Sequence, residues 1–569
     1  MKRFDSMKEN NIDFFAAILI TILVLLTRLP FISKYLYEWD SVNFALSFEH
    51  YSTALQQPQA PGYILYVGLG RLVNSVINDA NSTMIIISIV FSILTILMVY
   101  FFAKQIFSPK IAIVGSLILI FSPIFWFYGE LATIYPVESF MAILVVYTSY
   151  NVLKGRKNFI YISALVLGIA GGFREDLILF MLPLWIYCVL SYTKNLKKLL
   201  GTASIFFASI LVWAAPTVIL AGGLKAYMSS SSSIKDSFST TSILFGAPLK
   251  NQLIMDSMLL SWLILGLGIV IVVAVIFFLF KNWKPLLLKS STFKKPKFIF
   301  FILWIVPALL FQILIHAPKP GYILIFLPAL SMLSGYILVS ISKGLSKKFD
   351  LTPNSVLTCI LLISIVLNCF YFIYPYNFNA EETWETPVNQ MTQVQQIKLG
   401  FDMLAVYNYP KIHINDVNMD MHLKTIQEIS DYEPNNTVIV IRDITREDQG
   451  FSWRKAMYYL PEYYTCYLLD QENSEFKSSK LSQNVSISYG QNHQPGGSVN
   501  QTIQIPLDKS KKHIVWIMSD KSEFFREVQS KIGVESIELP NGLKIYYSNI
   551  ENKSLNIEIG GFIFKTEDK

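Results

Sequence analysis

Cysteine, histidine and charged side chains are all scarce in this sequence. Its 569 residues include 4 Cys and 6 His, and charged residues make up 15% of the chain against 53% hydrophobic residues. Three cysteines fall in apolar runs and one stands alone in a polar region, namely Cys188, Cys359 and Cys369, and Cys466. This supply is too small and too scattered for a disulfide framework or a cysteine-based metal site. The net charge of +7 comes from lysines in short loops beside apolar runs, which indicates anionic lipid rather than nucleic acid as the neighbour.

What the sequence has instead is long stretches without charge. Many reach about 20 residues, the length that an α-helix needs to cross the hydrocarbon core of a bilayer. They predict a polytopic α-helical membrane protein with about eleven transmembrane helices. The predicted spans are Phe14–Ile32, Met84–Ala103, Ile111–Tyr128, Ile134–Leu153, Phe159–Phe173, Leu177–Tyr192, Leu199–Ala221, Met258–Phe280, Phe298–Ile315, Tyr322–Ser342 and Val356–Tyr374.

Lysine and arginine are concentrated in alternate loops between these spans. The positive-inside rule makes the lysine-rich loops cytoplasmic, together with the N-terminus. The alternation holds only if the stretch Gly62–Ile77 does not cross the bilayer, so we predict a helix in the outer interface there. The first apolar stretch has a basic start but no small-residue cleavage site after it, and we expect a membrane helix rather than a cleaved signal peptide.

Acidic residues are the scarcest charged group of the membrane-spanning region. Residues 1–375 hold 28 Lys and Arg but 14 Asp and Glu. Ten of these 14 acids fall in segments that the predicted topology places on the outer side, which is therefore where we expect the chemistry. They are Glu38, Asp40, Glu49, Asp79, Glu130, Glu138, Glu175, Asp176, Asp236 and Asp256.

The composition changes after Tyr374. Residues 376–569 carry 19 Lys and Arg against 26 Asp and Glu, and an odd number of spans places them outside the membrane. Strand-like runs alternate there with helical ones, which predicts a small α/β domain. The expected strands are Thr437–Ile441, Tyr464–Leu469, His513–Met518 and Lys544–Tyr547, and the expected helices are Trp453–Tyr459 and Glu523–Lys531. The chain thus divides into a transmembrane catalytic domain, 1–375, whose first outer loop is 33–83 with interfacial helices, and an extracytoplasmic α/β domain, 376–569.

The first outer loop places two carboxylates beside aromatic residues. Glu38 and Asp40 flank Trp39, and a stretch punctuated by prolines, 57–63, then returns the chain to the membrane surface. Tryptophan favours the headgroup region, so this loop holds a carboxylate at that depth on a constrained backbone. A solvated loop acid without a chemical role is an equally good interpretation of this pattern alone.

Further polar residues lie on the outer face at the ends of later spans. Glu138 and Tyr135 begin the fourth span, Arg174 lies between the fifth and the sixth, and Lys319 and Tyr322 join the ninth to the tenth. Arg174 and Lys319 are candidates to bind an anionic headgroup, since a phosphate needs a cation beside it. The two acids that follow Arg174 are interpreted as ordinary polar residues of a wet loop. No cluster of His or Cys accompanies these residues, so no metal site is predicted.

Several short motifs resemble those of one known superfamily. They are Trp39-Asp40-Ser41 with Phe44-Ala45-Leu46, Gln57-Pro58-Gln59-Ala60-Pro61-Gly62-Tyr63, Ser122-Pro123-Ile124-Phe125-Trp126 with Tyr135-Pro136-Val137-Glu138, and Gly171-Gly172-Phe173-Arg174. In order and spacing they are similar to prokaryotic multi-spanning glycosyltransferases of the GT-C superfamily, in the group related to protein O-mannosyltransferases and the DUF2723-type membrane proteins. The resemblance is good over about Phe14 to Leu190, and loose at Lys319-Pro320-Gly321-Tyr322 and Tyr458-Tyr459-Leu460-Pro461-Glu462.

The resemblance implies a glycosyltransferase in a prokaryotic cell membrane. Such enzymes take a sugar from a polyprenyl phosphate on the outer face and transfer it to an acceptor hydroxyl of a protein, lipid or glycan, usually with inversion. A carboxylate in the first outer loop acts as the base, which corresponds to Asp40 here, with Glu38 as the second candidate. A monophosphate leaving group can be stabilised by Arg or Lys, so no metal or other cofactor is expected. The candidate substrate-binding residues are Arg174, Lys319, Tyr322, Tyr63, Tyr135, Glu138 and Arg71.

Two other functions remain open on the sequence. A non-catalytic lipid or glycan transporter would also need many spans, but transporters usually carry ionisable residues and broken helices near mid-membrane, in repeated halves. In this sequence the charges lie at the outer ends of the spans and no internal repeat is evident. A ligase that transfers a preassembled lipid-linked glycan is the second alternative, because the outer domain could hold a larger acceptor.

Overall fold

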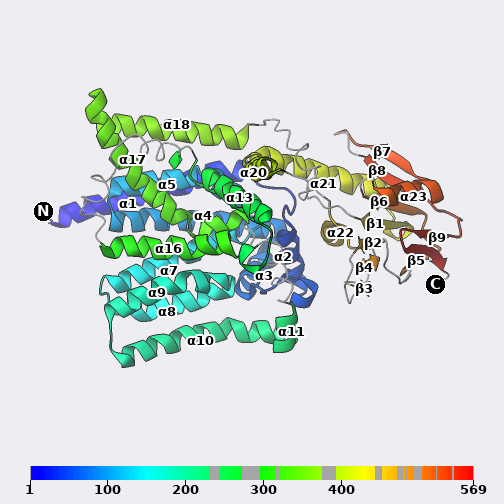
Figure 1. Cartoon of the computed structure of the whole chain (residues 1–569), viewed down its shortest axis with the longest axis horizontal. Helices are drawn as coiled ribbons and strands as arrows, with labels where there is room; N and C mark the ends of the chain where they lie inside the picture. The colour runs from blue at the N-terminus through cyan, green and yellow to red at the C-terminus, as the bar shows by residue number, and fades with distance from the viewer. Residues whose placement is uncertain are drawn as a thin grey trace. The chain divides into compact units, whose positions relative to one another are not determined.

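The structure is a computed structural model that describes residues 2–230, 242–268, 270–271, 295–315, 319–374, 392–442, 451–470, 478–480, 485–490, 503–518, 520, 522–540 and 544–567. The chain forms two compact units (Figure 1). The helical unit comprises Met1–Ser33 and Ser47–Lys411, and the α/β unit comprises Lys34–Leu46 and Ile412–Lys569. A segment of the first outer loop, Lys34–Leu46, is therefore part of the α/β unit. The domain boundary expected at residue 375 lies outside the described residues.

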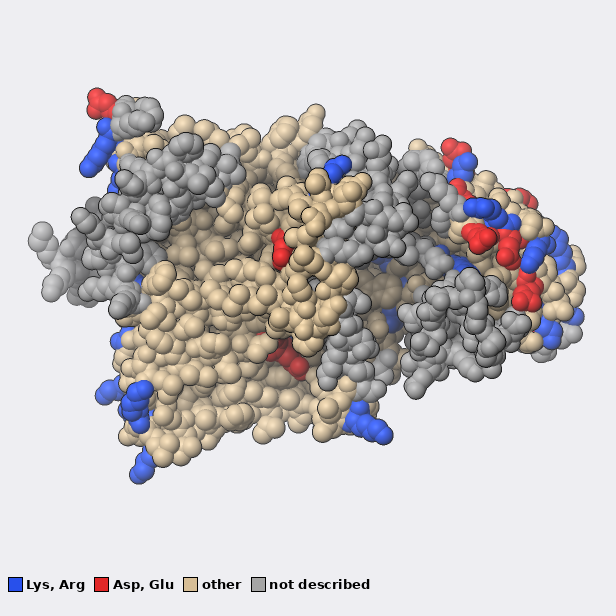
Figure 2. All heavy atoms as spheres, viewed as in Figure 1, with Lys and Arg blue, Asp and Glu red and all other residues tan. Residues whose placement is uncertain are grey.

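The helical unit is built from apolar helices, as the hydropathy predicts. Among the described residues, seven helices are long and apolar enough to cross a membrane. They are α1 (Lys2–Arg28), α4 (Ala80–Ile106), α7 (Tyr135–Leu153), α10 (Leu196–Leu220), α16 (Lys295–Leu314), α17 (Leu327–Phe349) and α18 (Pro353–Ile373). On the visible face of this unit, Lys and Arg lie at its ends and the broad surface between them is almost free of charge (Figure 2). The predicted polytopic membrane protein is confirmed.

Shorter elements complete the helical unit. α5 (Pro109–Ile120) and α6 (Pro123–Gly129) form a further candidate span that is bent by 64°. The shorter apolar helices are α3 (Ile64–Ile77), α8 (Phe159–Phe173), α9 (Asp176–Tyr192) and α13 (Leu249–Leu267). The remaining helices are η1 (Leu29–Phe31), η2 (Thr53–Leu55), α11 (Leu224–Ser230), η3 (Ile243–Phe245), η5 (Pro320–Ile325), α20 (Gln393–Asp402) and η7 (Met403–Ala405). One more helix, α2 (Trp39–Glu49), belongs to the α/β unit up to Leu46.

Two predicted spans differ from the structure because prolines interrupt them. The predicted span Ile111–Tyr128 breaks at Ser122, which caps α6 by accepting a hydrogen bond from the Phe125 amide at 3.4 Å, and Pro123 starts the new helix. The predicted span Tyr322–Ser342 starts too early, because η5 occupies 320–325 and α17 begins at Leu327. The last part of the predicted span Met258–Phe280 lies outside the described residues.

Close helix packing in the unit depends on small residues. A Cβ atom added to Gly335 of α17 would lie 3.0 Å from the backbone nitrogen of Gly115 in α5. A Cβ atom on Gly115 would lie 3.2 Å from the Ser331 carbonyl oxygen. Helices in a bilayer gain little from hydrophobic burial against each other, so such close backbone contact supplies the van der Waals attraction that joins them.

The α/β unit contains a mixed sheet, as expected. Seven of its described strands form one sheet in the order β3-β4-β2-β1-β6-β8-β7, and three form another in the order β5-β10-β9. β1 pairs in parallel with β2 and β6, and β2 pairs in parallel with β4. The strands are β1 (Thr437–Arg442), β2 (Tyr464–Asp470), β3 (Ser478–Lys480), β4 (Val485–Gly490), β5 (Ile503–Asp508), β6 (His513–Ile517), β7 (Glu535–Glu538), β8 (Lys544–Asn549), β9 (Asn556–Ile559) and β10 (Phe562–Glu567).

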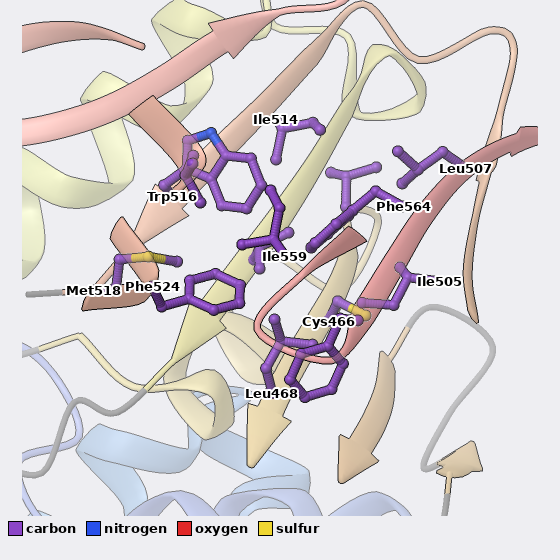
Figure 3. Packing of buried hydrophobic residues seen from close by; sticks show 14 of the residues in the cluster. Cys466, Leu468, Ile505, Leu507, Ile514, Trp516, Met518, Phe524, Ile559 and Phe564 are labelled. Carbon is purple, nitrogen blue, oxygen red and sulfur yellow. The ribbon is translucent and has the colours of Figure 1, made fainter. Parts of the chain in front are cut away.

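Two hydrophobic cores cover the two faces of the larger sheet. On β1, Ile439 and Ile441 face one core and Val438 and Val440 face the other, as the two-residue period of a strand requires. The first core is closed by α21 (Tyr409–Ile429), whose residues from Ile412 belong to this unit, and by α22 (Trp453–Tyr459). The second is closed by α23 (Glu523–Lys531) and by the smaller sheet (Figure 3). Three partly buried side chains of the Lys34–Leu46 segment, Tyr35, Trp39 and Leu46, pack against the first core.

Candidate active site

A buried arginine is the centre of a charged cluster in the helical unit. Arg174 follows α8 in an extended conformation, and 5% of its surface is exposed. Its Nη1 atom lies 2.7 Å from Oε1 of Glu138, in the first turn of α7, and its Nε atom donates to Oδ2 of Asp176, at the start of α9, at 2.9 Å. The positive end of a helix dipole favours a carboxylate, so two helix starts supply the partners that a buried guanidinium needs.

Aromatic rings enclose the same guanidinium. The ring of Tyr322, in η5, lies 4.1 Å from the guanidinium carbon of Arg174, and the ring of Tyr135 lies 5.9 Å from it. Gly321 packs directly against Tyr135, since a Cβ atom there would lie 2.3 Å from the ring. The lack of a side chain at this position therefore lets η5 lie against the start of α7. Tyr63 interacts electrostatically with the same guanidinium.

The charge of Arg174 is more than balanced by its partners. When both carboxylates are ionised, one cation faces two anions. The remaining nitrogen, Nη2, makes no hydrogen bond to the residues that the structure describes, so its two N–H groups are left for a ligand. Lys319 is exposed at the start of η5, and its carbonyl accepts from the Tyr322 amide at 3.0 Å. A second cation thus lies one turn along the chain from the ring that covers Arg174.

An apolar cavity of about 420 Å³ begins at the residue after Arg174. It lies between α9, α10 and α11, and Ile178, Leu182, Trp213 and Val218 line its walls. At its rim the hydroxyl of Tyr227 donates to the carboxylate of Glu175. Both acids after Arg174, which the sequence alone interprets as ordinary residues of a wet loop, have defined partners in the structure.

The other predicted site residues lie elsewhere. Asp40 is the second residue of α2 and is half-buried, and the Glu38 carbonyl accepts from the Val42 amide at 3.4 Å; both belong to the α/β unit. Arg71, in α3, donates from Nη2 to the Ser47 carbonyl at 2.7 Å and so ties α3 to α2. The residues that the structure brings together are Arg174, Glu138, Tyr135, Tyr322, Tyr63 and Lys319.

Sequence reasoning also missed a second buried arginine. Arg28, near the end of α1, is 0% exposed, and its Nη1 atom donates to the Ile120 carbonyl at 2.8 Å. Its guanidinium carbon lies 5.6 Å from the ring centre of Trp126, and it interacts electrostatically with Glu130, which is also 0% exposed. The signal was present, because Arg28 is the one charge within the apolar run 14–32 and an intramembrane charge implies a partner.

Comparison with solved structures identifies the class of fold. ArnT from Cupriavidus metallidurans bound to undecaprenyl phosphate is similar over 96% of this chain and 98% of its own, with a TM-score of 0.53 and 12% identity. The apo state of the same protein gives a TM-score of 0.52, with 10% identity, over 95% and 98% of the two chains. The chain therefore has the fold of the GT-C membrane glycosyltransferases, and the predicted resemblance is confirmed.

One part of the chain also matches a protein-family model. Residues 63–219 match the family described as dolichyl-phosphate-mannose-protein mannosyltransferase. The matched region includes Tyr63, Tyr135, Glu138 and Arg174, and all the described helices that line the cavity except α11. An oligosaccharyltransferase from Archaeoglobus fulgidus is similar over 80% of this chain and 63% of its own, at a TM-score of 0.42 and 13% identity. No curated protein sequence matches the chain significantly.

Proposed function

We propose that this protein is a glycosyltransferase that moves a sugar from a polyprenyl-phosphate-linked donor to an acceptor hydroxyl of a protein, lipid or glycan. The observation that carries the proposal is the cluster around Arg174, together with an apolar cavity whose lining includes the next residue, Glu175, within the region that matches a mannosyltransferase family. A polyprenyl phosphate joins an apolar chain to an anionic headgroup, and the helical unit offers an apolar cavity for the first and the Arg174 guanidinium for the second. The likeness to a protein that binds undecaprenyl phosphate supports the same donor class.

The cations would bind the donor phosphate and stabilise its departure. Nη2 of Arg174 offers two N–H groups, and exposed Lys319, at the start of η5, offers a point charge. As the bond between the anomeric carbon and the phosphate oxygen breaks, negative charge grows on the phosphate, so both contacts strengthen in the transition state. Glu138 and Asp176 hold the guanidinium in place rather than contact the substrate.

Asp40 is the proposed base, with Glu38 as the second candidate. The acceptor oxygen attacks the anomeric carbon, its proton passes to the Asp40 carboxylate, and the lipid phosphate leaves with the electron pair of the broken bond. A single displacement of this kind inverts the anomeric centre. We propose that it needs no metal, since the leaving group is a monophosphate; among the described residues no group of three His, Cys, Asp or Glu side chains is arranged to hold a metal ion.

The proposed topology places the α/β unit and the reaction on the outer face of a prokaryotic cell membrane, with the N-terminus in the cytoplasm. Cysteines introduced at exposed Ser510 and at exposed Asn158, in the basic loop between α7 and α8, test it in a background without Cys359 and Cys369. An impermeant thiol reagent on intact cells should label the cysteine at 510 and leave that at 158 unlabelled. Labelling at 158 in sealed cells would contradict this topology.

Sugar release from defined donors tests the function. The purified protein in nanodiscs is given a panel of polyprenyl-phosphate sugars in the presence of EDTA, and free and transferred sugar are measured. Release or transfer from at least one donor is expected. Binding of the lipids without release from any of them would support a non-catalytic transporter, and turnover of a preassembled lipid-linked glycan alone would support a ligase. Loss of activity in EDTA would contradict the metal-free mechanism.

A further inference from the structure

The segment that carries the proposed base is built into the α/β unit. Lys34–Leu46 groups with Ile412–Lys569, although almost 370 residues separate the two stretches in sequence. Asp40 lies in the middle of this segment, immediately after Trp39 at the start of α2. Whatever fixes the residues on either side of Asp40 therefore fixes the backbone from which its carboxylate extends.

Side chains of the α/β unit satisfy three consecutive backbone donors of the segment. The Asp416 carboxylate accepts from the amides of Lys34 at 2.8 Å and Tyr35 at 3.2 Å. The Tyr459 hydroxyl accepts from the Leu36 amide at 2.8 Å. Lys34, Tyr35 and Leu36 precede α2 and belong to none of the described strands or helices, so the three hydrogen bonds help to set the path by which the chain reaches Asp40.

One turn along α21, Asp420 fixes the side chains of the same residues. It accepts from Nζ of Lys34 at 2.7 Å and from the Tyr35 hydroxyl at 2.9 Å. Hydrogen bonds from Lys34, Lys424 and Tyr35 hold the pKa of the Asp420 carboxyl well below its usual range. The carboxylate therefore stays ionised at neutral pH, where its contact with Lys34 persists.

Apolar contacts continue the attachment up to Asp40 and beyond it. The rings of Trp39 and Trp453 meet edge to face at 5.3 Å, and those of Tyr35 and Tyr459 at 5.4 Å. Tyr35, Trp39 and Leu46 all pack against the core between the sheet and its first helix layer. Asp40 thus has anchored neighbours on both sides, and the segment completes a core of the α/β unit.

We propose that the α/β unit positions the catalytic base, with Asp416, Tyr459 and Trp453 as positioning residues that act through the Lys34–Leu46 segment. This inference rests on the proposed function, since it gives Asp40 the role of base. A base acts only when it is held within hydrogen-bonding reach of the acceptor hydroxyl, and a displacement of about 1 Å costs roughly 10²-fold in rate. The α/β unit is then part of the catalytic machinery through this segment.

Tyr459→Phe and Asp416→Asn test the proposal in the full-length protein, with Tyr546→Phe as the matched control. Tyr546 lies in the same unit and donates to Asp520 at 3.0 Å, so its variant also loses one phenol hydroxyl, but none of the segment's hydrogen bonds. Two quantities are measured: hydrogen exchange of the amides of Lys34, Tyr35 and Leu36, and kcat and KM for the lipid-linked donor. We expect faster exchange and kcat lowered about 10-fold, with donor KM unchanged, in the two test variants but not in the control.

The outcomes separate failure of this inference from failure of the proposed function. Unchanged amide exchange would overturn the attachment itself. Faster exchange with unchanged kcat, in an enzyme that Asp40→Asn inactivates, would overturn the positioning role while the proposed function stands. If wild type transfers no sugar, or if Asp40→Asn is fully active, the assignment of the base fails and the positioning inference falls with it.

Discussion

The helical unit contains two buried arginines whose surroundings differ. Arg174 contacts two carboxylates and a tyrosine face, and its Nη2 atom makes no hydrogen bond to a described residue. Arg28 is fully enclosed: it donates to a backbone carbonyl, lies against aromatic rings, and has Nε and Nη2 buried without a partner among the described residues. Both have an acidic residue nearby, so burial and charge alone do not distinguish a substrate site from a structural pair.

What distinguishes them is access. A cation that binds a substrate must exchange one partner for another, which requires a free donor and a path to solvent or lipid. Arg174 keeps a small exposed surface, 5% of its area, and its two carboxylates hold the guanidinium in place. Arg28 has donors without a partner among the described residues but no such path, since it is 0% exposed and Gly129 packs so closely that a Cβ atom there would lie 3.2 Å from Nε of the arginine. We therefore expect Arg174 to control turnover and Arg28 to control stability.

The largest effect is expected for Arg174→Met. The substitution keeps the apolar stem but leaves Glu138 and Asp176 without their cation. The free energy of unfolding should therefore fall by about 3–5 kcal/mol, and donor turnover should be lost. Arg174→Lys should retain part of the stability and part of the donor turnover, because lysine supplies the charge without the planar guanidinium. Thermal unfolding and sugar release measure the two effects.

A double variant separates the two roles of this arginine. Adding Glu138→Gln to Arg174→Met removes one unpaired carboxylate and should recover part of the stability without recovering turnover. Recovery of turnover along with stability would show that Arg174 is structural, like Arg28, and would remove the distinction between the two arginines.

A smaller effect, on stability alone, is expected for Arg28→Met. The variant loses the hydrogen bond to Ile120 and leaves Glu130 buried beside apolar rings, which should lower the free energy of unfolding by about 1–3 kcal/mol. The folded fraction should keep the kcat and donor KM of wild type. A changed donor KM at a temperature where the variant is fully folded would place Arg28 in the substrate site.

The smallest effect on stability is expected for Lys319→Met, because Lys319 is exposed. The free energy of unfolding should change by less than about 0.5 kcal/mol, while donor KM should rise roughly 10-fold if the ammonium contacts the phosphate. Lys343→Met, at an exposed lysine of α17, is the matched control and should leave KM unchanged. Equal KM values for the two variants would exclude a phosphate contact by Lys319.

Hydropathy predicted much of the fold because a helix in lipid must be apolar and must satisfy the hydrogen bonds of its own backbone. Each of the eleven predicted spans corresponds to a helix or a bent helix pair, at least over its described part. In the α/β unit, strand-like runs such as Thr437–Ile441 correctly predicted strands. Alternate side chains of such a run point toward the two cores on opposite faces of the sheet. The breaks at Ser122 and Phe326 were missed although Pro123 and Pro328 mark them.

Contacts between distant segments could not be predicted from one sequence. Lys34 and Asp420 are separated by 386 residues, and nothing in either local pattern indicates the other. Asp176 was interpreted as a solvated acid. Its pairing with Arg174 depends on the extended backbone of Arg174 between α8 and α9, and hydropathy does not predict that backbone conformation. Arg174, Tyr135, Tyr322 and Lys319 were named from motifs and helix ends, and the structure supplies the distances that join them.

Asp40 is the residue that we propose accepts the proton of an acceptor hydroxyl during transfer from a polyprenyl-phosphate sugar. The most direct test is single-turnover sugar transfer by wild type, Asp40→Asn, Glu38→Gln and the control Glu49→Gln, an exposed acid at the other end of α2. Asp40→Asn should bind the donor as wild type does but transfer sugar about 10²-fold more slowly or worse, while Glu49→Gln transfers normally. Near-normal transfer by Asp40→Asn would show that Asp40 is not the base, and loss of transfer in Glu38→Gln instead would assign that role to Glu38.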